Sequence, residues 1–212
     1  MSQVGGFSQE TVLYAVCECG NSLCFVPIYC LLIFKLLSYL PHLCLSHCLS
    51  ISDVYMLHWP DSMQPGRSNR ELRAESWRAL EELIEQRLCR SIGVSNFMIH
   101  HLEQLKQDCT VVPHVNQVEY HPYQQPNKLM ENRRQQGITF QGYCPLAKGQ
   151  ALSDPTIIQL AQKYGCTPAQ ICICWSIQVI FMTINGNCIG RQETIKNLHD
   201  GRRVSWDPAN VE

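Results

Sequence analysis

The first fifty residues of this chain contain no aspartate and only three formal charges, Glu10, Glu18 and Lys35. We expect no secretory signal peptide, because no basic region precedes the apolar run of residues 25–49 and no clear small-residue cleavage site follows it. The run has the length of a membrane span, which needs about 20 apolar residues. Lys35 near its middle would cost about 3 kcal/mol in a bilayer. We therefore favour a hydrophobic segment that does not span a membrane, with a span as the alternative.

The formal net charge of the whole chain is also close to zero, at -1 for 212 residues. This balance gives no general attraction to nucleic acid or to an anionic membrane surface, and we expect neither as a partner. The thirteen cysteines follow no disulfide framework, because their number is odd and their spacing is irregular. Cys17 and Cys19 do not have the spacing of a zinc-binding pair. We expect no metal site and a reducing, cytoplasmic location, the cytosol.

From residue 53 onward, apolar runs of strand length alternate with amphipathic runs of helix length. Strands are predicted at residues 54–57, 92–94, 115–119, 138–143 and 179–184. Helices are predicted at residues 71–87, 99–107, 127–136, 156–164 and 168–177. This alternation favours an α/β fold with a parallel sheet and right-handed crossovers. The chain is short for a complete eightfold barrel, which typically needs about 250 residues.

Residues 54–60 form a short apolar run that ends on a histidine, a tryptophan and a proline. Pro60 cannot continue a central ladder, so His58 is expected at the carboxyl end of a buried strand. In a parallel α/β barrel this end carries the chemistry, and a histidine there can hydrogen-bond a carbonyl or transfer a proton. The alternatives are a core histidine bonded to a backbone carbonyl and, for Trp59, ordinary packing.

Three later runs also end on polar or aromatic groups: RSIGVSNF at 90–97, VNQVEYHP at 115–122 and ITFQGYCPL at 138–146. With the histidine run, these motifs occur in the order and at the helix-length spacings of the aldo-keto reductase family, which the chain resembles from about Asp53 to Ile184. The resemblance implies a partial (β/α)8 TIM barrel of about strands 4–8, in a family-like domain at residues 53–212 after an unrelated hydrophobic segment at 1–52. It also implies NADPH as cofactor and a small carbonyl substrate, an aldehyde or ketone reduced to an alcohol.

The residues that contact the cofactor in this family correspond here to Ser95, Asn96, Gln117, Tyr143, Cys144 and Leu146. By resemblance, the first three hydrogen-bond the nicotinamide carboxamide and Tyr143 stacks on the nicotinamide ring. The last two belong to a loop that passes over the pyrophosphate, where backbone amides can meet phosphate oxygens. Each residue alone has a simpler explanation, because Ser and Asn favour turns and the other two polar side chains fit a solvated strand end and a rim aromatic.

In the family, a tyrosine supplies the proton, a lysine and an aspartate tune it, and a histidine orients the carbonyl. His58 corresponds to the histidine, and Trp59 to a residue of the substrate pocket. The other three belong to the part of the barrel before the histidine strand, where this chain has no aspartate and Lys35 lacks strand context. Losing a positioned proton donor costs about 10²–10⁴ in rate. We therefore expect weak or absent activity, and the alternative is a catalytically inactive relative that at most binds nucleotide.

The sequence after Ile184 also departs from the family pattern. The family has a Pro-Lys-Ser type motif there, followed by an arginine and an asparagine that grip the adenosine 2′-phosphate and the adenine. This chain reads NGNCIGRQ at residues 185–192. Charge-assisted contacts to phosphate are the strong ones, so we expect weaker cofactor affinity and a weaker preference for the phosphorylated dinucleotide.

Overall fold

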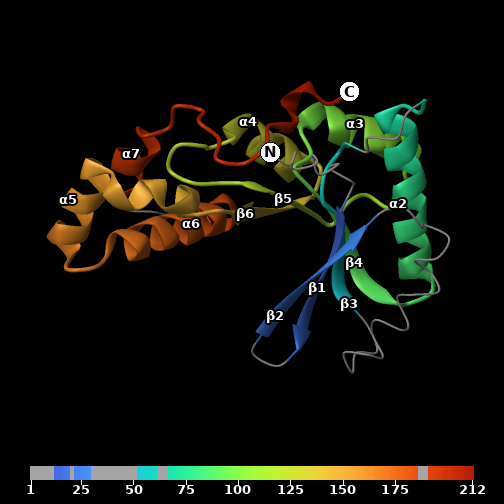
Figure 1. The fold of residues 1–212 in the computed structure, drawn as a ribbon, viewed down its shortest axis with the longest axis horizontal. Coiled ribbons are helices and arrows are strands. Elements are labelled where there is room, and N and C mark those ends of the chain that lie inside the picture. The colour runs from blue at the N-terminus through green and yellow to red at the C-terminus, as the bar shows by residue number, and fades with distance from the viewer. Residues whose placement is uncertain (1–11, 20–21, 30–51, 62–65, 186–190) are drawn as a thin grey trace, which may run out of the picture. The chain divides into compact units, whose positions relative to one another are not determined.

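The computed structural model describes residues 12–19, 22–29, 52–61, 66–185 and 191–212. The chain divides into two compact units, the first comprising residues 1–116 and Pro208–Glu212 and the second Gln117–Asp207. Strand β5 (Val115–Glu119) begins in the first unit and ends in the second. Its bounds are those predicted from the sequence. Figure 1 shows the elements of both units.

The sheet of the first unit contains the parallel pair that the sequence predicted. β3 (Ser52–Leu57) and β4 (Cys89–Ser95) run parallel, with Tyr55 opposite Ile92. Both of these side chains are fully buried, as expected for strands that are apolar on both faces. Because the strands are parallel, the residues that follow them lie at the same edge of the sheet.

The same sheet continues with a hairpin that the sequence analysis did not predict. β1 (Val12–Cys19) and β2 (Ser22–Tyr29) are antiparallel, and β1 also pairs antiparallel with β3, which gives the order β2-β1-β3-β4. Figure 1 shows this hairpin in blue. In the sequence Gly20-Asn21 separates the two strands, and this dipeptide is typical of two-residue hairpin connections.

The apolar run considered as a membrane span lies mostly outside the described residues. Its first residues, 25–29, belong to β2, and residues 30–49 are among those that the structure does not describe. Of the helices in the described ranges, none combines the length and the apolarity needed to cross a membrane.

The α-helices among the described residues of the first unit are α2 (Asn69–Glu85) and α3 (Ile99–Asp108), drawn in green in Figure 1. α2 begins slightly before the predicted range because Ser68 and Glu71 form a capping box, in which each side chain accepts the other's backbone N–H at 3.3 Å. Its apolar stripe lies at helical spacing as predicted, with buried Leu72, Trp77, Leu80 and Leu83.

Helix α3 carries a fully buried histidine whose proton can be assigned. The backbone N–H of Met98 donates to Nδ1 of His101 at 3.0 Å, so Nδ1 is the acceptor and Nε2 carries the hydrogen. Nε2 lies 2.8 Å from the carbonyl oxygen of Val211, to which it donates. Burial, with smaller contributions from His100 and Arg73, outweighs the bond to Val211 and lowers the pKa of His101 to about 4. The folded chain therefore holds this ring neutral.

We expect the free energy of unfolding to fall as the pH drops from about 6.5 towards 4. In the unfolded chain this histidine takes up a proton at its ordinary pKa, whereas in the folded chain it stays neutral down to a much lower pH. Acid therefore favours unfolding. The contribution of His101 is at most about 3 kcal/mol. Urea denaturation at pH 7, 6 and 5 measures it, with His101→Gln as the variant that cannot titrate. An equally steep pH dependence in His101→Gln would contradict the assignment.

The second unit is built around the end of β5 and the following strand, β6 (Thr139–Tyr143). The backbone N–H of Tyr120 donates to the carbonyl of Tyr143 at 3.0 Å. Tyr120 also stacks on Trp175, with ring centroids 5.0 Å apart, and both residues are buried. Helical segments of this unit are α4 (Asn127–Gln135), η1 (Ala147–Ser153), α5 (Pro155–Tyr164), α6 (Pro168–Asn185) and α7 (Arg191–Lys196).

The predicted strand at residues 179–184 is wrong, because these residues belong to helix α6. The helix was predicted to end at residue 177, but it continues to Asn185. A short apolar run cannot be assigned to strand or helix from periodicity alone. No glycine or proline follows Pro168 until Gly186, so the sequence has no strong signal that would end the helix earlier.

Candidate functional site

In the first unit, the structure brings His58 and Asn96 together. His58 follows β3 and Asn96 follows β4, and the parallel pairing places both at the carboxyl edge of the sheet. Nδ2 of Asn96 donates to the backbone carbonyl of His58 at 3.0 Å. The sequence predicted both positions but not the bond between them.

The Ser95-Asn96 turn is buried and has an unusual backbone. Asn96 has a φ of 62°, a left-handed conformation that asparagine adopts more readily than most residues. Its Nδ2 also lies 3.2 Å from Oγ of Ser95, and both residues are 2% exposed. Ser95 and Asn96 can form this turn and still contact a ligand, because the turn holds the hydroxyl and the amide in place at the edge of the sheet.

His58 and Trp59 are both half-buried, and their rings meet edge to face with centroids 5.4 Å apart. Burial lowers the pKa of His58 to about 4. The imidazole is therefore neutral near pH 7. A neutral ring donates one hydrogen bond to a carbonyl oxygen, which suits an orienting role better than the role of a strong general acid.

Asn116 is a buried polar residue next to the candidate site that the sequence did not single out. It is 1% exposed, and its Nδ2 donates to the backbone carbonyl of Phe97 at 2.9 Å. This bond ties the start of β5 to the chain just after the Ser95-Asn96 turn. A polar side chain inside a buried strand was the signal that could have identified it, because such groups are retained only when they are bonded.

The second unit contains Gln117, Tyr143, Cys144 and Leu146, each half-buried. Burial is the main cause that raises the pKa of Tyr143 to about 12 and that raises the pKa of the Cys144 thiol. Tyr143 therefore remains a neutral phenol and Cys144 a thiol rather than a thiolate nucleophile. The structure brings Tyr143 and Cys144 to the end of β6, as predicted.

The loop after β6 has strained backbone at three non-glycine residues. The φ angles are 57° at Cys144, 49° at Ala147 and 51° at Lys148. Such conformations cost energy and often occur in segments that bind a ligand. This loop is the one expected to pass over a pyrophosphate.

The eight predicted site residues are thus divided between the two units. His58, Trp59, Ser95 and Asn96 belong to the first, and the other four to the second. Their assembly into one site stays a prediction. No cluster of histidine, cysteine, aspartate or glutamate that could hold a metal ion is found among the described residues.

Comparison with known proteins gives a consistent result. The sequence model described as Aldo/keto reductase family matches residues 49–188, more than half of the chain. Over 126 residues the chain is 44% identical to the uncharacterized oxidoreductase ZK1290.5 of Caenorhabditis elegans, covering 59% of this chain and 39% of that protein. Over 132 residues it is 38% identical to the glyoxal reductase of Bacillus subtilis (strain 168), covering 62% and 45%. The chain thus spans less than half the length of these two relatives.

Solved structures are similar as well. MGS-M4, an aldo-keto reductase enzyme from a Medee basin deep-sea metagenome library, matches with a TM-score of 0.71 and 26% identity, over 85% of this chain and 71% of that one. A mutant of Gox0644 in complex with NADPH matches with a TM-score of 0.69 and 31% identity, over 83% and 69%. The partial α/β barrel expected from the sequence is therefore confirmed.

Proposed function

The chain belongs to the aldo/keto reductase family, and from this premise we propose that it reduces the carbonyl of small aldehydes or ketones to an alcohol, with NADPH as hydride donor. The observation that carries the proposal is the bond from Nδ2 of Asn96 to the carbonyl of His58. It links the candidate carboxamide partner to the candidate carbonyl-orienting residue. The NADPH complex of Gox0644 and the name of the glyoxal reductase support the cofactor and substrate class.

The residues of this chain suit the nicotinamide end of the cofactor. A carboxamide both donates and accepts hydrogen bonds, and the Ser95 hydroxyl and Asn96 amide offer the complementary groups on a buried turn. In the second unit, Gln117 offers another amide, Tyr143 an aromatic face, and the strained loop of Cys144 and Leu146 its backbone amides. When bound, NADPH supplies the hydride.

The chain's own contribution to the reaction is to orient the carbonyl. Neutral His58 donates a hydrogen bond to the substrate oxygen, and Trp59 beside it gives an apolar wall that excludes water. A pKa of about 4 leaves His58 mostly unprotonated near neutral pH, so it is a poor source of the proton that the product needs. For this reason we expect slow turnover.

The second candidate function is nucleotide binding without turnover. The antiparallel pairing of β1 with β3 favours it, because a (β/α)8 barrel would place a parallel strand beside the histidine strand. The absence of aspartate from the first fifty residues points the same way. In this reading residues 1–52 do not supply the proton donor of the family.

Thermal melts with NADPH, together with an assay of aldehyde reduction, separate the two candidates. Saturation at about 100 times the dissociation constant stabilises a folded protein by about 2.7 kcal/mol, so the melting temperature should rise. A rise with turnover supports the reductase, and a rise without turnover supports the nucleotide-binding relative. Neither effect, in a chain that melts cooperatively, would reject both.

Replacing Asn96 with glycine tests the carboxamide contact. Glycine accepts the left-handed backbone without strain, so the change removes the side-chain amide together with its bond to the His58 carbonyl. We expect NADPH to bind about tenfold more weakly, the effect of losing one good hydrogen bond. The control is Gln135→Ala, which removes an exposed amide from α4. Equal NADPH affinity in the two variants, measured by fluorescence titration, would remove Asn96 from the proposed site.

A further inference from the structure

The backbone around Trp59 has left the strand ladder and is held by two side chains. Nδ2 of Asn96 donates to the carbonyl of His58 at 3.0 Å, and Nη1 of Arg73 donates to the carbonyl of Pro60 at 2.8 Å. The proline ring already fixes φ at residue 60. The bond to its carbonyl also fixes the following peptide plane, so the carbonyls on both sides of Trp59 are restrained.

Arg73 reaches this position from helix α2 and is only 4% exposed. Its Nη1 also donates to the carbonyl of Glu212 at 2.8 Å, and its Nη2 to Oε1 of Gln104 at 2.5 Å. Two of these acceptors, the Pro60 carbonyl and the Gln104 amide oxygen, carry no charge. Burial lowers the pKa of Arg73 to about 10, although the charges of Asp61 and Asp108 oppose this shift. Burying a guanidinium is costly, and an apolar residue would fill the same space at less cost. The fixed geometry of its planar donor fork is what an apolar residue cannot supply.

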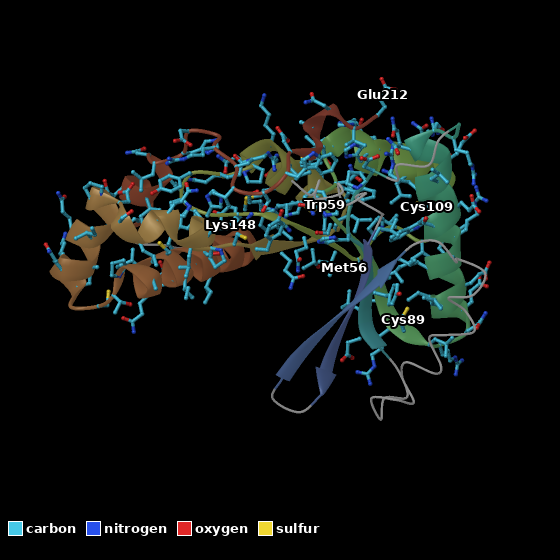
Figure 2. All side chains as sticks on the ribbon, in the orientation of Figure 1. Met56, Trp59, Cys89, Cys109, Lys148 and Glu212 are labelled. Atoms are coloured by element: carbon cyan, nitrogen blue, oxygen red, sulfur yellow. The ribbon has the colours of Figure 1, made fainter. Side chains whose placement is uncertain are left out.

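The segment Pro208–Glu212 is itself held on helix α3. The carbonyl of Val211 lies 2.9 Å from Nε2 of His100 and accepts from Nε2 of His101 at 2.8 Å. Pro208 and Val211 are buried. These contacts bring the Glu212 carbonyl to Arg73. Figure 2 labels Glu212, whose backbone oxygen accepts from Arg73, and Trp59, which directly precedes the Pro60 that Arg73 also contacts.

We propose that Arg73 is a positioning residue for His58 and Trp59. Through its fork, α3 and the segment Pro208–Glu212 hold the backbone that presents the candidate orienting histidine and the candidate substrate-pocket tryptophan. The consequence for carbonyl binding rests on the proposed function, whereas the positioning of Trp59 does not. Loss of the fork frees the Pro60 carbonyl and changes the surroundings of the Trp59 ring.

Fluorine NMR of protein labelled with 5-fluorotryptophan tests this without cofactor or turnover. The chain has four tryptophans, and Trp59→Phe identifies the Trp59 signal. In Arg73→Gln we expect that signal to shift or broaden while the signal of Trp175 in the second unit stays in place. The matched control is Arg70→Gln, which removes an exposed charge of the same helix and should leave Trp59 unchanged. An unchanged Trp59 signal in a folded Arg73→Gln would overturn the proposal.

If Arg73→Gln does not fold, two milder variants test whether Arg73 positions Trp59. Arg73→Lys keeps the charge but replaces the planar fork with a compact ammonium, so the fixed geometry of the three bonds is lost. Gln104→Leu removes one acceptor. Both should move the Trp59 signal by less than the loss of the arginine, and no movement in either would overturn the proposal. Where the protein reduces an aldehyde, Arg73→Lys should raise the KM for the aldehyde more than the Kd for NADPH. Failure of NADPH to bind would reject the proposed function and leave the fluorine result to decide on Arg73.

Discussion

Replacing Gly93 with alanine is expected to lower the free energy of unfolding by about 3 kcal/mol or more. A Cβ at this position would lie 2.3 Å from Cγ1 of Val115 and 2.7 Å from the Val115 carbonyl oxygen. It would also lie 3.2 Å from Cγ of Met56 on the neighbouring strand. The methyl group therefore meets a backbone atom of β5 as well as side chains, and the strands would have to separate to accept it.

Urea denaturation followed by circular dichroism measures this loss. Gly137→Ala is the matched control, because a Cβ there meets nothing within 4 Å and only the φ of 73° is unfavourable. That control should cost about 1 kcal/mol. A Gly93→Ala variant no less stable than Gly137→Ala would show that β4 and β5 do not approach as closely as the structure has them.

The same glycine illustrates what a sequence reveals about a strand. The predicted strand at 92–94 lies inside β4, and β5 was predicted residue for residue, because each is a short run with valine or isoleucine that lies between two well-marked amphipathic helices. A glycine inside such a strand also signals a close approach of another backbone. The sequence does not say which backbone approaches, because Val115 lies in a different element.

The candidate site was predictable to the extent that it follows strand ends. His58 and Asn96 were placed correctly because each follows a recognisable apolar strand. Arg73 was not, because its partner Glu212 is 139 positions away and charged helix residues are usually exposed. Local patterns in the sequence show where a strand ends. Which side chains support that strand end depends on contacts with residues that are distant in the sequence.

A buried carboxylate in the second unit should have the other large effect. Oε1 of Glu119 accepts from Nε2 of His121 at 2.7 Å and from the Val204 N–H at 2.6 Å, and Oε2 accepts from the Ser205 N–H at 3.1 Å. Burial alone would raise the pKa of Glu119, but these hydrogen bonds outweigh it and lower the pKa below its ordinary value. The stabilisation is therefore present above about pH 4 and is lost as acid protonates the folded carboxylate.

Glu119→Ala is expected to destabilise the chain by about 3–5 kcal/mol, because it leaves buried donors without their acceptor. Glu119→Gln keeps the shape and one oxygen, but places an NH₂ group against one donor, so it should cost about 1–3 kcal/mol. Glu131→Gln, an exposed change on α4, is the control and should cost almost nothing. Equal urea midpoints for Glu119→Gln and Glu131→Gln would contradict the anchoring role.

Glu119 also affects Tyr143, the residue proposed to contact the nicotinamide ring. Ser205, whose backbone Glu119 holds, hydrogen-bonds Tyr143 through its side chain, and the charge of Glu119 adds to the effect of burial in raising the pKa of that phenol. Glu119→Gln should therefore lower the pKa of Tyr143, which ultraviolet titration of the phenol can follow against a Tyr143→Phe reference. A chain that loses stability without any change at Tyr143 would assign Glu119 to the fold alone. A change in both the stability and the pKa of Tyr143 would show that Glu119 also supports Tyr143, the residue expected to stack on the cofactor.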